Sequence, residues 1–441
     1  MHIWTICQYF KPEPGAPSAR LSGLAKQWVK QGHDVSILTS VPNHPQGEYH
    51  PDYKKSKAVF TEEEDGYTIV RHKFFITPNS KFLKKTWSHI SFAWKVYKAH
   101  KKIKFTQKPD IIMASSPSFF CVISAWRLSR IHKVPFVFEV RDLWPGIFRE
   151  LGTIKNETVL KTIEKLEMFL YRKAGSVVTV TKGFAKNIAD RGIDPKKLYV
   201  ITNGVSDDEW QTATDPKKNG DVSRLQSEFQ INNMTKVLLY IGTHGQSQAL
   251  GQIIDAARMM MNNSETLFLF VGDGADKARI ESLAKGMPNV QFIPSQQKEK
   301  VWAFYNLAYA CFIPLKDIPG FATFIPSKMF EVMAAGTPIV AMLQGEAADI
   351  LNQSQSSIVC PPEKPEILGR ELQTLIENPA KAEQMGRQGR QFVSQNYLHS
   401  TLAKKYIMIF ERTISQHKWQ KKKFYSLVLL ALQVNVSYKN W

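Results

Sequence analysis

Cysteine is scarce in this chain. The 441 residues include four cysteines, which lie far apart and form no Cys-x-x-Cys pair: Cys7, Cys121, Cys311 and Cys360. This spacing argues against a disulfide framework and a structural zinc site, and it favours a reducing compartment. No window reaches the ~18 uninterrupted apolar residues of a membrane-spanning helix, and no signal-peptide pattern opens the chain. We therefore expect a cytoplasmic protein.

Several catalytic motifs are absent as well. The chain contains no His-Glu-x-x-His, no Gly-x-Ser-x-Gly and no phosphate-binding P-loop sequence. The turn after the first predicted strand is not a Gly-x-Gly-x-x-Gly fingerprint, which argues against a dinucleotide cofactor. The 11 histidines are scattered along the chain, and no metal-binding cluster is visible in the sequence. We expect neither a cofactor nor a metal ion.

Positive charge is abundant, and part of it is concentrated. The net charge of +19 calls for an anionic partner, and the segment from Lys81 to Lys104 holds eight lysines and no acid. Five apolar side chains alternate with them at steps of four and three, as on one stripe of a helix: Leu83, Trp87, Ile90, Trp94 and Tyr97. Tryptophan beside lysine favours a helix on an anionic membrane surface, although a core-facing stripe on a solvated helix would share the pattern. No motif of a nucleic-acid binder accompanies the charge.

Short apolar runs alternate with helical patterns along almost the whole chain. Such alternation predicts two doubly wound α/β domains with parallel sheets, whose ligands bind at the carboxyl ends of the strands in a shared inter-domain cleft. The expected divisions are residues 1–205, a linker and domain entry at 206–235, a second domain at 236–395, a helix at 396–415 returning to the first domain, and a basic, apolar tail at 416–441. The tail is either a second membrane element or a frayed end.

The segment from Phe321 to Val340 is the most informative stretch of the sequence. It predicts a loop, a helix from about Lys328 to Ala335, and a strand that follows Gly336 and Pro338.

The predicted helix begins with groups that suit an anion. We expect Ser327 to cap it, so that backbone N–H groups and the positive end of the helix dipole face a ligand. Lys328 adds a charge at the same place, and Glu331 lies one turn further along. This set suits a nucleoside diphosphate with its ribose, although a capped helix with an exposed lysine would have the same sequence.

Three glycine turns and one charged segment follow predicted strands. Gly15 precedes a helix that carries Arg20, and the turns Gly242–Gly245 and Gly272–Gly274 occupy the position where phosphates bind in α/β domains. The segment Glu139–Pro145 ends a buried strand with charged residues, which are costly there unless they are paired or lie in a cleft.

Within that charged segment, Arg141 could hold a phosphate and Asp142 could accept a proton or a sugar hydroxyl. A structural Arg141–Asp142 pair is the alternative.

Together, these segments resemble a known family. Six motifs occur in order between about residues 1 and 412: Gly15…Arg20, Gln31–Thr39, Pro42–Gly47, Arg141–Pro145, Asn203–Val205 and Pro326–Pro338. With these motifs the chain resembles the retaining GT-B glycosyltransferases of glycosyltransferase family 4, in particular the branch that adds amino sugars such as N-acetylfucosamine to bacterial O-antigens and capsules.

The resemblance implies that the second domain holds a UDP-sugar and the first an acceptor. Glu331 would bind the ribose, Lys328 and the Gly242 turn the diphosphate, and Phe321–Phe324 the donor sugar. The expected donor-binding residues are Gly15, Arg20, Gly242, Thr243, Gly245, Gly274, Pro294, Ser295, Thr323, Phe324, Lys328 and Glu331.

Two departures from the family pattern stand out. Thr323 replaces a glutamate that many members carry, and Thr243–Gln248 lacks their Arg and Lys. Phosphate charge would then fall to Lys328 and to Arg20 or Arg141.

The implied reaction is sugar transfer with retention at the anomeric carbon, in which the leaving phosphate takes the acceptor's proton. Lys328, Arg141 and Asp142 are the expected catalytic residues, acting by positioning and charge stabilisation. The acceptor would be a saccharide on a polyprenyl diphosphate, and the protein would lie on the cytoplasmic face of the inner membrane. Two alternatives remain open: a UDP-sugar 2-epimerase of the same architecture, and a non-enzymatic binder of membranes or nucleic acid.

Overall fold

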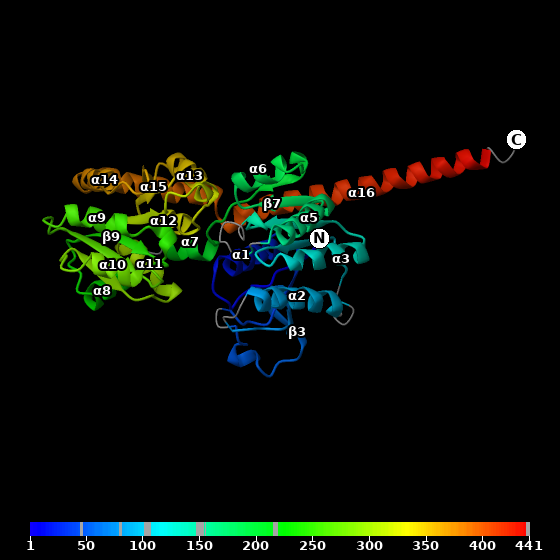
Figure 1. Cartoon of the computed structure of the whole chain (residues 1–441), viewed down its shortest axis with the longest axis horizontal. Coiled ribbons are helices and arrows are strands. Elements are labelled where there is room, and N and C mark those ends of the chain that lie inside the picture. Colours follow the sequence, from blue (N-terminus) through cyan, green and yellow to red (C-terminus); the bar gives the residue numbers. More distant parts are fainter. Residues whose placement is uncertain are drawn as a thin grey trace. The chain divides into compact units, whose positions relative to one another are not determined.

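The computed structural model describes residues 1–44, 47–78, 82–100, 107–146, 154, 156–214 and 219–437. The chain divides into two compact units, coloured from blue to red along the sequence in Figure 1. Unit 1 comprises Met1–Ile201 together with Leu402–Trp441, and unit 2 comprises Thr202–Thr401.

Unit 1 is built on an eight-stranded sheet with the order β3-β4-β2-β1-β5-β6-β7-β8. Apart from β3, which pairs antiparallel with β4, neighbouring strands are parallel. All residues of the central strands β1, β5 and β6 are buried, as expected for a sheet covered on both faces. The strands are β1 (His2–Ile6), β2 (Asp34–Ser40), β3 (Val59–Glu64), β4 (Tyr67–His72), β5 (Ile111–Ser115), β6 (Phe136–Val140), β7 (Ser176–Thr179) and β8 (Leu198–Val200).

Helices cover both faces of this sheet and form two apolar cores. One core packs α2, α3 and α5 against the sheet, and the other packs α1 and α16. The helices are α1 (Ala16–Lys30), η1 (Pro51–Tyr53), α2 (Phe82–Ala99), α3 (Phe120–His132), α5 (Glu157–Lys173), α6 (Lys182–Asp190), η2 (Pro195–Lys197) and α16 (His399–Ser437). The last helix therefore completes a core whose other members lie at least about 200 residues earlier in the chain.

Unit 2 has an all-parallel six-stranded sheet with the order β11-β10-β9-β12-β13-β14. Its strands are β9 (Lys236–Ile241), β10 (Thr266–Val271), β11 (Val290–Ile293), β12 (Ala310–Pro314), β13 (Ile339–Met342) and β14 (Ser357–Cys360). Its helices are α7 (Asp207–Thr214), α8 (Asn219–Glu228), η4 (Gln246–Gln248), α9 (Gly251–Met259), α10 (Lys277–Leu283), α11 (Lys298–Leu307), η5 (Pro319–Thr323), α12 (Lys328–Ala335), α13 (Glu346–Ser354), α14 (Pro365–Glu377) and α15 (Pro379–Asn396).

The strand orders locate the places where ligands bind in sheets of this kind. In unit 2 the chain leaves β9 towards β10 on one side and places β12 on the other, so the order reverses between β9 and β12. In unit 1 the corresponding reversal lies between β1 and β5. Crevices at the carboxyl ends of such strand pairs are the general ligand sites of doubly wound sheets.

The predicted fold class, two doubly wound parallel-sheet domains, is confirmed within each unit. The structure also contains an antiparallel hairpin, β3–β4, which the predicted alternation of strands and helices does not include. Its turn, Asp65-Gly66, is a typical hairpin sequence. The segment expected as a linker at 206–235 instead contains α7 and α8, whose Ala213 and Leu225 are buried in a core of unit 2.

The C-terminal helix also differs from the expected 396–415 span. It runs from His399 to Ser437, and its residues from Leu402 onward belong to unit 1. Residues 438–441 of the expected tail lie outside the described residues. Across the helices that the structure describes, none combines the length and apolarity required to span a bilayer.

Candidate functional site

Helix α12 carries the basic group of the candidate site in unit 2. It spans Lys328–Ala335 as predicted, and Gly336 ends it in the left-handed conformation (φ 74°) that glycine adopts without strain. The Lys328 Nζ atom donates a hydrogen bond of 2.8 Å to the Ile241 carbonyl oxygen at the end of β9. It also lies 4.5 Å from the centre of the Tyr240 ring. A lysine on α12 is thereby fixed at the switch point between β9 and β12.

The start of α12 differs from the prediction in one respect. Ser327 has helical backbone angles and its side chain makes no capping hydrogen bond. The first-turn N–H groups of Met329 and Phe330 donate instead to the carbonyl oxygens of Pro326 and Ser327. The chain enters the helix through a tight turn, so an extended cap conformation is not available to Ser327. The Lys328 ammonium is therefore the strongest anion-binding group at this helix end.

The glycine turns after β9 and β10 lie against each other. A Cβ atom on Gly272, which has φ 145°, would come within 1.9 Å of the Gly242 carbonyl oxygen, so no other residue fits. The His244 N–H donates to the Asp273 carbonyl at 2.8 Å, and Gly274 lies against the His244 backbone. The structure thus brings together two predicted turns that are separated by about 30 residues in the sequence.

The Gly242 turn also meets Lys328. A Cβ atom at Gly242 would lie 2.4 Å from Lys328 Nζ, so the glycine makes room for the ammonium. Within the same turn, the Tyr240 hydroxyl donates to the Thr243 carbonyl at 2.7 Å, and Gly245 follows directly before η4. Gly242, Thr243 and Lys328, predicted from separate motifs, therefore lie at one place.

His244 lies inside this turn, and sequence reasoning assigns it no role. Its side chain is buried among Tyr240, Phe270 and Phe292, and neither ring nitrogen has a hydrogen-bond partner among the described residues. Burial, together with the nearby charge of Lys277, lowers its pKa. The only sequence signal for this neutral, buried histidine is its place between two turn glycines.

Glu331 lies in a second polar cluster of unit 2. Its Oε2 accepts a 3.0 Å hydrogen bond from the Tyr305 hydroxyl. Burial and the neighbouring Glu209 raise the pKa of Glu331, while Lys298 and Lys328 act in the opposite direction. Glu209 is itself paired with Lys298 at 2.5 Å.

The charges of Lys328 and Glu331 influence each other. Burial lowers the pKa of Lys328, opposed by nearby Cys311 and Glu331. A lysine with a lowered pKa gains most from an anionic ligand, because the ligand replaces the hydration that burial removed. The two residues predicted to bind phosphate and ribose are thus electrostatically coupled.

The other predicted donor contacts lie on neighbouring loops of unit 2. Pro294 and Ser295 come directly after β11, the strand beside β10. Thr323 ends η5, where its hydroxyl donates to the Gly320 carbonyl at 3.2 Å, and Phe324 follows with half of its surface exposed. These loops follow strands β11 and β12, and thus lie at the same edge of the sheet as the Gly242 turn.

Arg20 does not have the role that the sequence suggests. Its side chain is buried and pairs with Glu139 (Nε to Oε1, 3.0 Å). It also donates to the Ile201 carbonyl at 2.8 Å and to the Tyr406 hydroxyl at 2.9 Å. The prediction of Arg20 as a donor-phosphate ligand is corrected accordingly: its guanidinium ties α1, β6 and α16 together inside unit 1.

The remaining unit 1 candidates lie close to this network. Gly15, with φ 120°, precedes α1. The Arg141 N–H donates to Ser116 Oγ at 2.7 Å, and its Nη1 is buried without a partner among the described residues. Burial raises the pKa of Asp142, opposed by Arg141. Arg141 thus keeps a donor that a ligand could use.

The predicted aromatic stripe of α2 is divided between solvent and the core, because Ile90 and Tyr97 are half-buried and Tyr97 packs against the core. Trp87 is 58% exposed and Trp94 48% exposed, whereas Phe92 and Val96 fill the core on the opposite face. The alternative of a core-facing stripe is therefore wrong for both tryptophans.

Lysines accompany the exposed tryptophans on α2. The Lys98 ammonium lies 4.7 Å from the Trp94 ring centre. Further lysines are exposed on the helix: Lys84, Lys85 and Lys95. The side chains of Lys81, Leu83 and residues 101–104, which belong to the same predicted stripe and charge run, lie outside the described residues.

Comparison with known protein families identifies the class of enzyme. Residues 19–209 match the model described as Glycosyltransferase Family 4, and residues 221–392 match that described as Glycosyl transferases group 1. The chain belongs to these glycosyltransferases. It is therefore an enzyme, and the alternative of a non-enzymatic binder is wrong; neither match favours the epimerase.

Relatives and solved structures agree with this class. The chain is 24% identical over 369 residues to the putative colanic acid biosynthesis glycosyl transferase WcaI of Escherichia coli K12, covering 80% of this chain and 88% of WcaI. Sucrose-phosphate synthase from Thermosynechococcus elongatus superposes with a TM-score of 0.69 at 16% identity, over 94% of this chain and 99% of that one. Anabaena HepE, solved with UDP-glucose, has a TM-score of 0.64 at 16% identity, over 94% and 100%. These glycosyltransferase neighbours confirm the GT-B fold class.

Proposed function

We propose that this glycosyltransferase transfers an N-acetylated sugar from a UDP-sugar to a saccharide carried on a polyprenyl diphosphate. The proposed donors include N-acetylated 6-deoxy sugars. Transfer proceeds with retention at the anomeric carbon. The product belongs to the synthesis of a cell-surface polysaccharide such as an O-antigen or a capsule.

One observation carries the proposal: the Lys328 ammonium lies against the Gly242 turn at the switch point between β9 and β12. A fixed cation beside closely packed glycine turns suits a diphosphate. The UDP and UDP-glucose complexes of HepE support UDP as the carrier. The similarity to WcaI, a putative colanic acid biosynthesis glycosyl transferase, supports a polysaccharide product.

In the proposed mechanism, the protein stabilises the departing UDP instead of supplying a nucleophile. Lys328 meets the charge that develops on the leaving diphosphate, and Glu331 binds the ribose hydroxyls. Arg141, whose Nη1 is buried without a partner among the described residues, and Asp142 are the catalytic candidates of unit 1, and the leaving phosphate takes the acceptor's proton. Fixed positive groups that face developing charge usually contribute most to the acceleration of such transfers.

The proposed acceptor places the enzyme at the cytoplasmic face of the inner membrane. The exposed Trp87 and Trp94, with lysines on the same helix, form a surface that fits anionic headgroups.

Vesicle binding tests this surface. The double change Trp87→Ser and Trp94→Ser should reduce the amount of protein that pellets with phosphatidylglycerol vesicles. Met234→Ser, at an exposed position of unit 2, is the matched control. Equal pelleting of all three proteins would reject this surface.

The first test of the proposed function is a thermal-shift titration with UDP, UMP, GDP and ADP, with and without EDTA. A ligand that binds only the folded state raises the melting temperature. We expect a shift with UDP that persists in EDTA, because no metal ion is proposed in the site, and that weakens with UMP, because one phosphate is missing. A shift with GDP or ADP alone would change the donor class, and a UDP shift abolished by EDTA would reject the metal-free site.

A further inference from the structure

Unit 1 contains a pocket that the proposed donor site does not use. It encloses about 410 Å³, within the usual range for small-molecule sites. The pocket lies within the segments that follow β1 and β2. Its wall combines proline and tyrosine surfaces with polar groups: Pro12, Glu13, Pro14, Pro42, Asn43, His44, Glu48, Tyr49, His50, Pro51 and Lys54.

Glu13 is the distinctive group in this wall. The residue is 5% exposed, and its Oε1 accepts hydrogen bonds from the N–H groups of Asn43 (2.7 Å) and His44 (2.9 Å). Its Oε2 is buried and has no hydrogen-bond partner among the described residues. A buried carboxylate oxygen without a donor is costly, so a donor supplied by a ligand would stabilise it.

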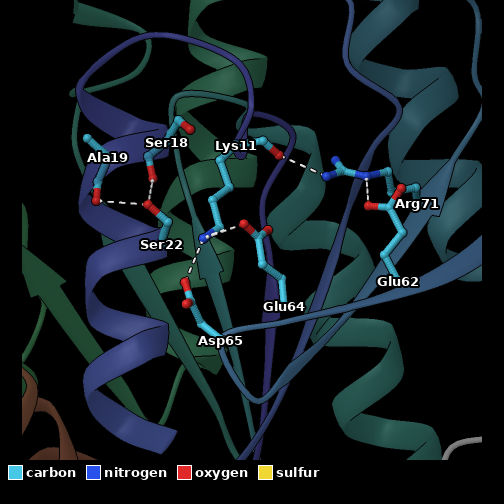
Figure 2. Close-up of polar contacts among 8 residues, drawn as sticks. All are labelled: Lys11, Ser18, Ala19, Ser22, Glu62, Glu64, Asp65 and Arg71. Atoms are coloured by element: carbon cyan, nitrogen blue, oxygen red, sulfur yellow. Dashed lines mark hydrogen bonds and ion pairs between the residues drawn. The ribbon is translucent and has the colours of Figure 1, made fainter. Parts of the chain in front are cut away.

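The chain two residues before Glu13 is tied to the β3–β4 hairpin through Lys11, whose contacts Figure 2 shows. Lys11 Nζ pairs with Glu64 at 3.0 Å and with Asp65 at 2.8 Å in the β3–β4 hairpin. Arg71 donates to the Lys11 carbonyl at 2.9 Å and pairs with Glu62 at 2.5 Å. The hairpin thus fixes the backbone two residues before Glu13, which positions the carboxylate before any ligand arrives.

The chemistry of the wall selects a class of ligand. Glu13 and Glu48 outweigh the charge of Lys54, so the wall is net negative and disfavours an anion such as a diphosphate, and its charged and polar groups disfavour a hydrocarbon chain. A sugar ring presents hydroxyl donors for a carboxylate and C–H faces for proline and tyrosine surfaces.

The pocket also lies near helix α2. The Tyr9 ring packs edge-on against His44 of the wall, with ring centres 5.4 Å apart, and against His89 of α2, with ring centres 6.5 Å apart. A single aromatic side chain therefore separates the wall from the helix that presents Trp87 and Trp94 to solvent.

We propose that this pocket binds the saccharide end of the acceptor, with Glu13 Oε2 accepting a hydrogen bond from a sugar hydroxyl. The inference rests on the proposed function for the identity of the acceptor. The lysine-bearing face of α2 would then lie near the diphosphate and lipid of the same molecule.

Glu13→Gln tests the hydrogen bond directly. The amide oxygen can keep the bonds to Asn43 and His44, while an N–H₂ group replaces Oε2 and donates instead of accepting. The side chain keeps its size, so the folded structure should tolerate the change. Glu63→Gln, at an exposed position of β3, removes the same charge away from the pocket and keeps an acceptor for the Thr68 hydroxyl.

The measurement is saturation-transfer NMR on the full chain with methyl glycosides of glucose, galactose, N-acetylglucosamine and N-acetylgalactosamine. At least one glycoside should bind the unmodified protein, and Glu13→Gln should weaken it by about tenfold or more, because a donor now faces the sugar hydroxyl where an acceptor stood. Glu63→Gln should leave binding unchanged. Glu48→Trp, which adds bulk at an exposed wall position, should also weaken binding and serves if Glu13→Gln does not fold.

The UDP thermal shift separates this inference from the proposed function. An unchanged UDP shift with no glycoside binding to the unmodified protein would overturn the pocket assignment alone. Equal glycoside affinity in Glu13→Gln and the unmodified protein would also overturn it. Absence of a UDP shift in the unmodified protein would instead count against the proposed function.

Discussion

Lys328 illustrates how a single side chain can be prepared for an anion. Burial lowers its pKa, and its ammonium is held by the Ile241 carbonyl and the Tyr240 ring. We expect Lys328→Met to reduce kcat by about 10²–10³-fold, the usual cost of removing one group that stabilises transition-state charge. A UDP-release assay measures the change. Lys277→Met, which loses a 3.3 Å contact with the Gly272 carbonyl, is the control and should have a smaller effect. Full kcat in Lys328→Met would reject its catalytic role.

Arg20 has a structural role that can be tested against its predicted one. Removing its guanidinium leaves the buried Glu139 without its ion-pair partner. We expect Arg20→Met to lower the free energy of unfolding by about 3–5 kcal/mol, as for other broken buried pairs. Urea unfolding measures this loss, and the exposed Arg130→Met should change it by less than about 0.5 kcal/mol. An Arg20→Met protein of normal stability that no longer binds UDP would restore the donor role.

His72 leads us to expect a dependence of stability on pH. It is fully buried, its Nδ1 lies 3.1 Å from the Thr39 carbonyl, and burial lowers its pKa from 6.5 to about 4. Well above pH 6.5 the histidine is neutral in both the folded and the unfolded state. As the pH falls towards 4, the unfolded chain binds a proton that the folded protein does not, so stability is lost.

Between about pH 7.5 and 5.0 this loss should amount to about 2 kcal/mol. Urea unfolding at the two pH values should therefore show a smaller difference for His72→Gln than for the unmodified protein. An identical difference in the two proteins would show that His72 does not contribute to the acid sensitivity.

At the scale of single elements, helix starts provide a direct comparison. Asn156 caps α5, and its side chain accepts from the N–H groups of Thr158 (2.9 Å) and Val159 (3.2 Å). Ser327 makes no such bond at α12. We expect Asn156→Ala to lower the free energy of unfolding by about 1 kcal/mol and Ser327→Ala by less than about 0.5 kcal/mol. Urea unfolding measures both; a larger loss for Ser327→Ala would show that its hydroxyl does cap the helix.

The elements also show which sequence signals are sufficient. The buried strand β9 and the helix α12 follow from local patterns, because an apolar run and a stop at Gly336 are visible in neighbouring residues. The β3–β4 hairpin escapes prediction although Asp65-Gly66 signals its turn, since its exposed, charged strand lacks the apolar run that marks the others. Helices α7 and α8 resemble a linker because their sequence is polar, and only a few side chains, such as Ala213 and Leu225, enter the core.

At the scale of the whole molecule, the two units differ in how the chain builds them. Unit 2 is one continuous segment, Thr202–Thr401, whereas unit 1 needs α16 from the end of the chain. Tyr406 and Phe410 of α16 are buried against Trp28 of α1.

Fragments of the chain should therefore behave differently. We expect residues 202–401 to fold alone and to keep the UDP thermal shift. Residues 1–201 should not fold cooperatively, because each large side chain of α16 contributes about 1.5–3 kcal/mol when buried. Circular-dichroism melting of the two fragments, with the full chain as control, measures this. A cooperative transition for residues 1–201 would show that α16 is dispensable for unit 1.

Some residues of the candidate site follow from local sequence patterns, and others depend on packing between distant parts of the chain. The Gly242 turn and Lys328 follow from motifs, since each stands beside a strand or helix signal in the sequence. The sequence misassigns Arg20 because its partners Glu139 and Tyr406 lie 119 and 386 residues away. Glu13 Oε2 and the ring nitrogens of His244 have no hydrogen-bond partner among the described residues, and no local sequence pattern encodes which atoms stay without a partner after folding.

The sequence by itself determined the alternation of strands and helices, the two-domain class and the motifs of a glycosyltransferase, because these depend on periodicity and on residues close together in the chain. The tertiary structure alone decided that Arg20 is internal, that Lys328 meets the Gly242 turn, that Trp87 and Trp94 are exposed, and that α16 completes unit 1. These outcomes depend on burial and on contacts between residues far apart in sequence, where the cost of an unpaired charge or an exposed apolar surface selects the partners.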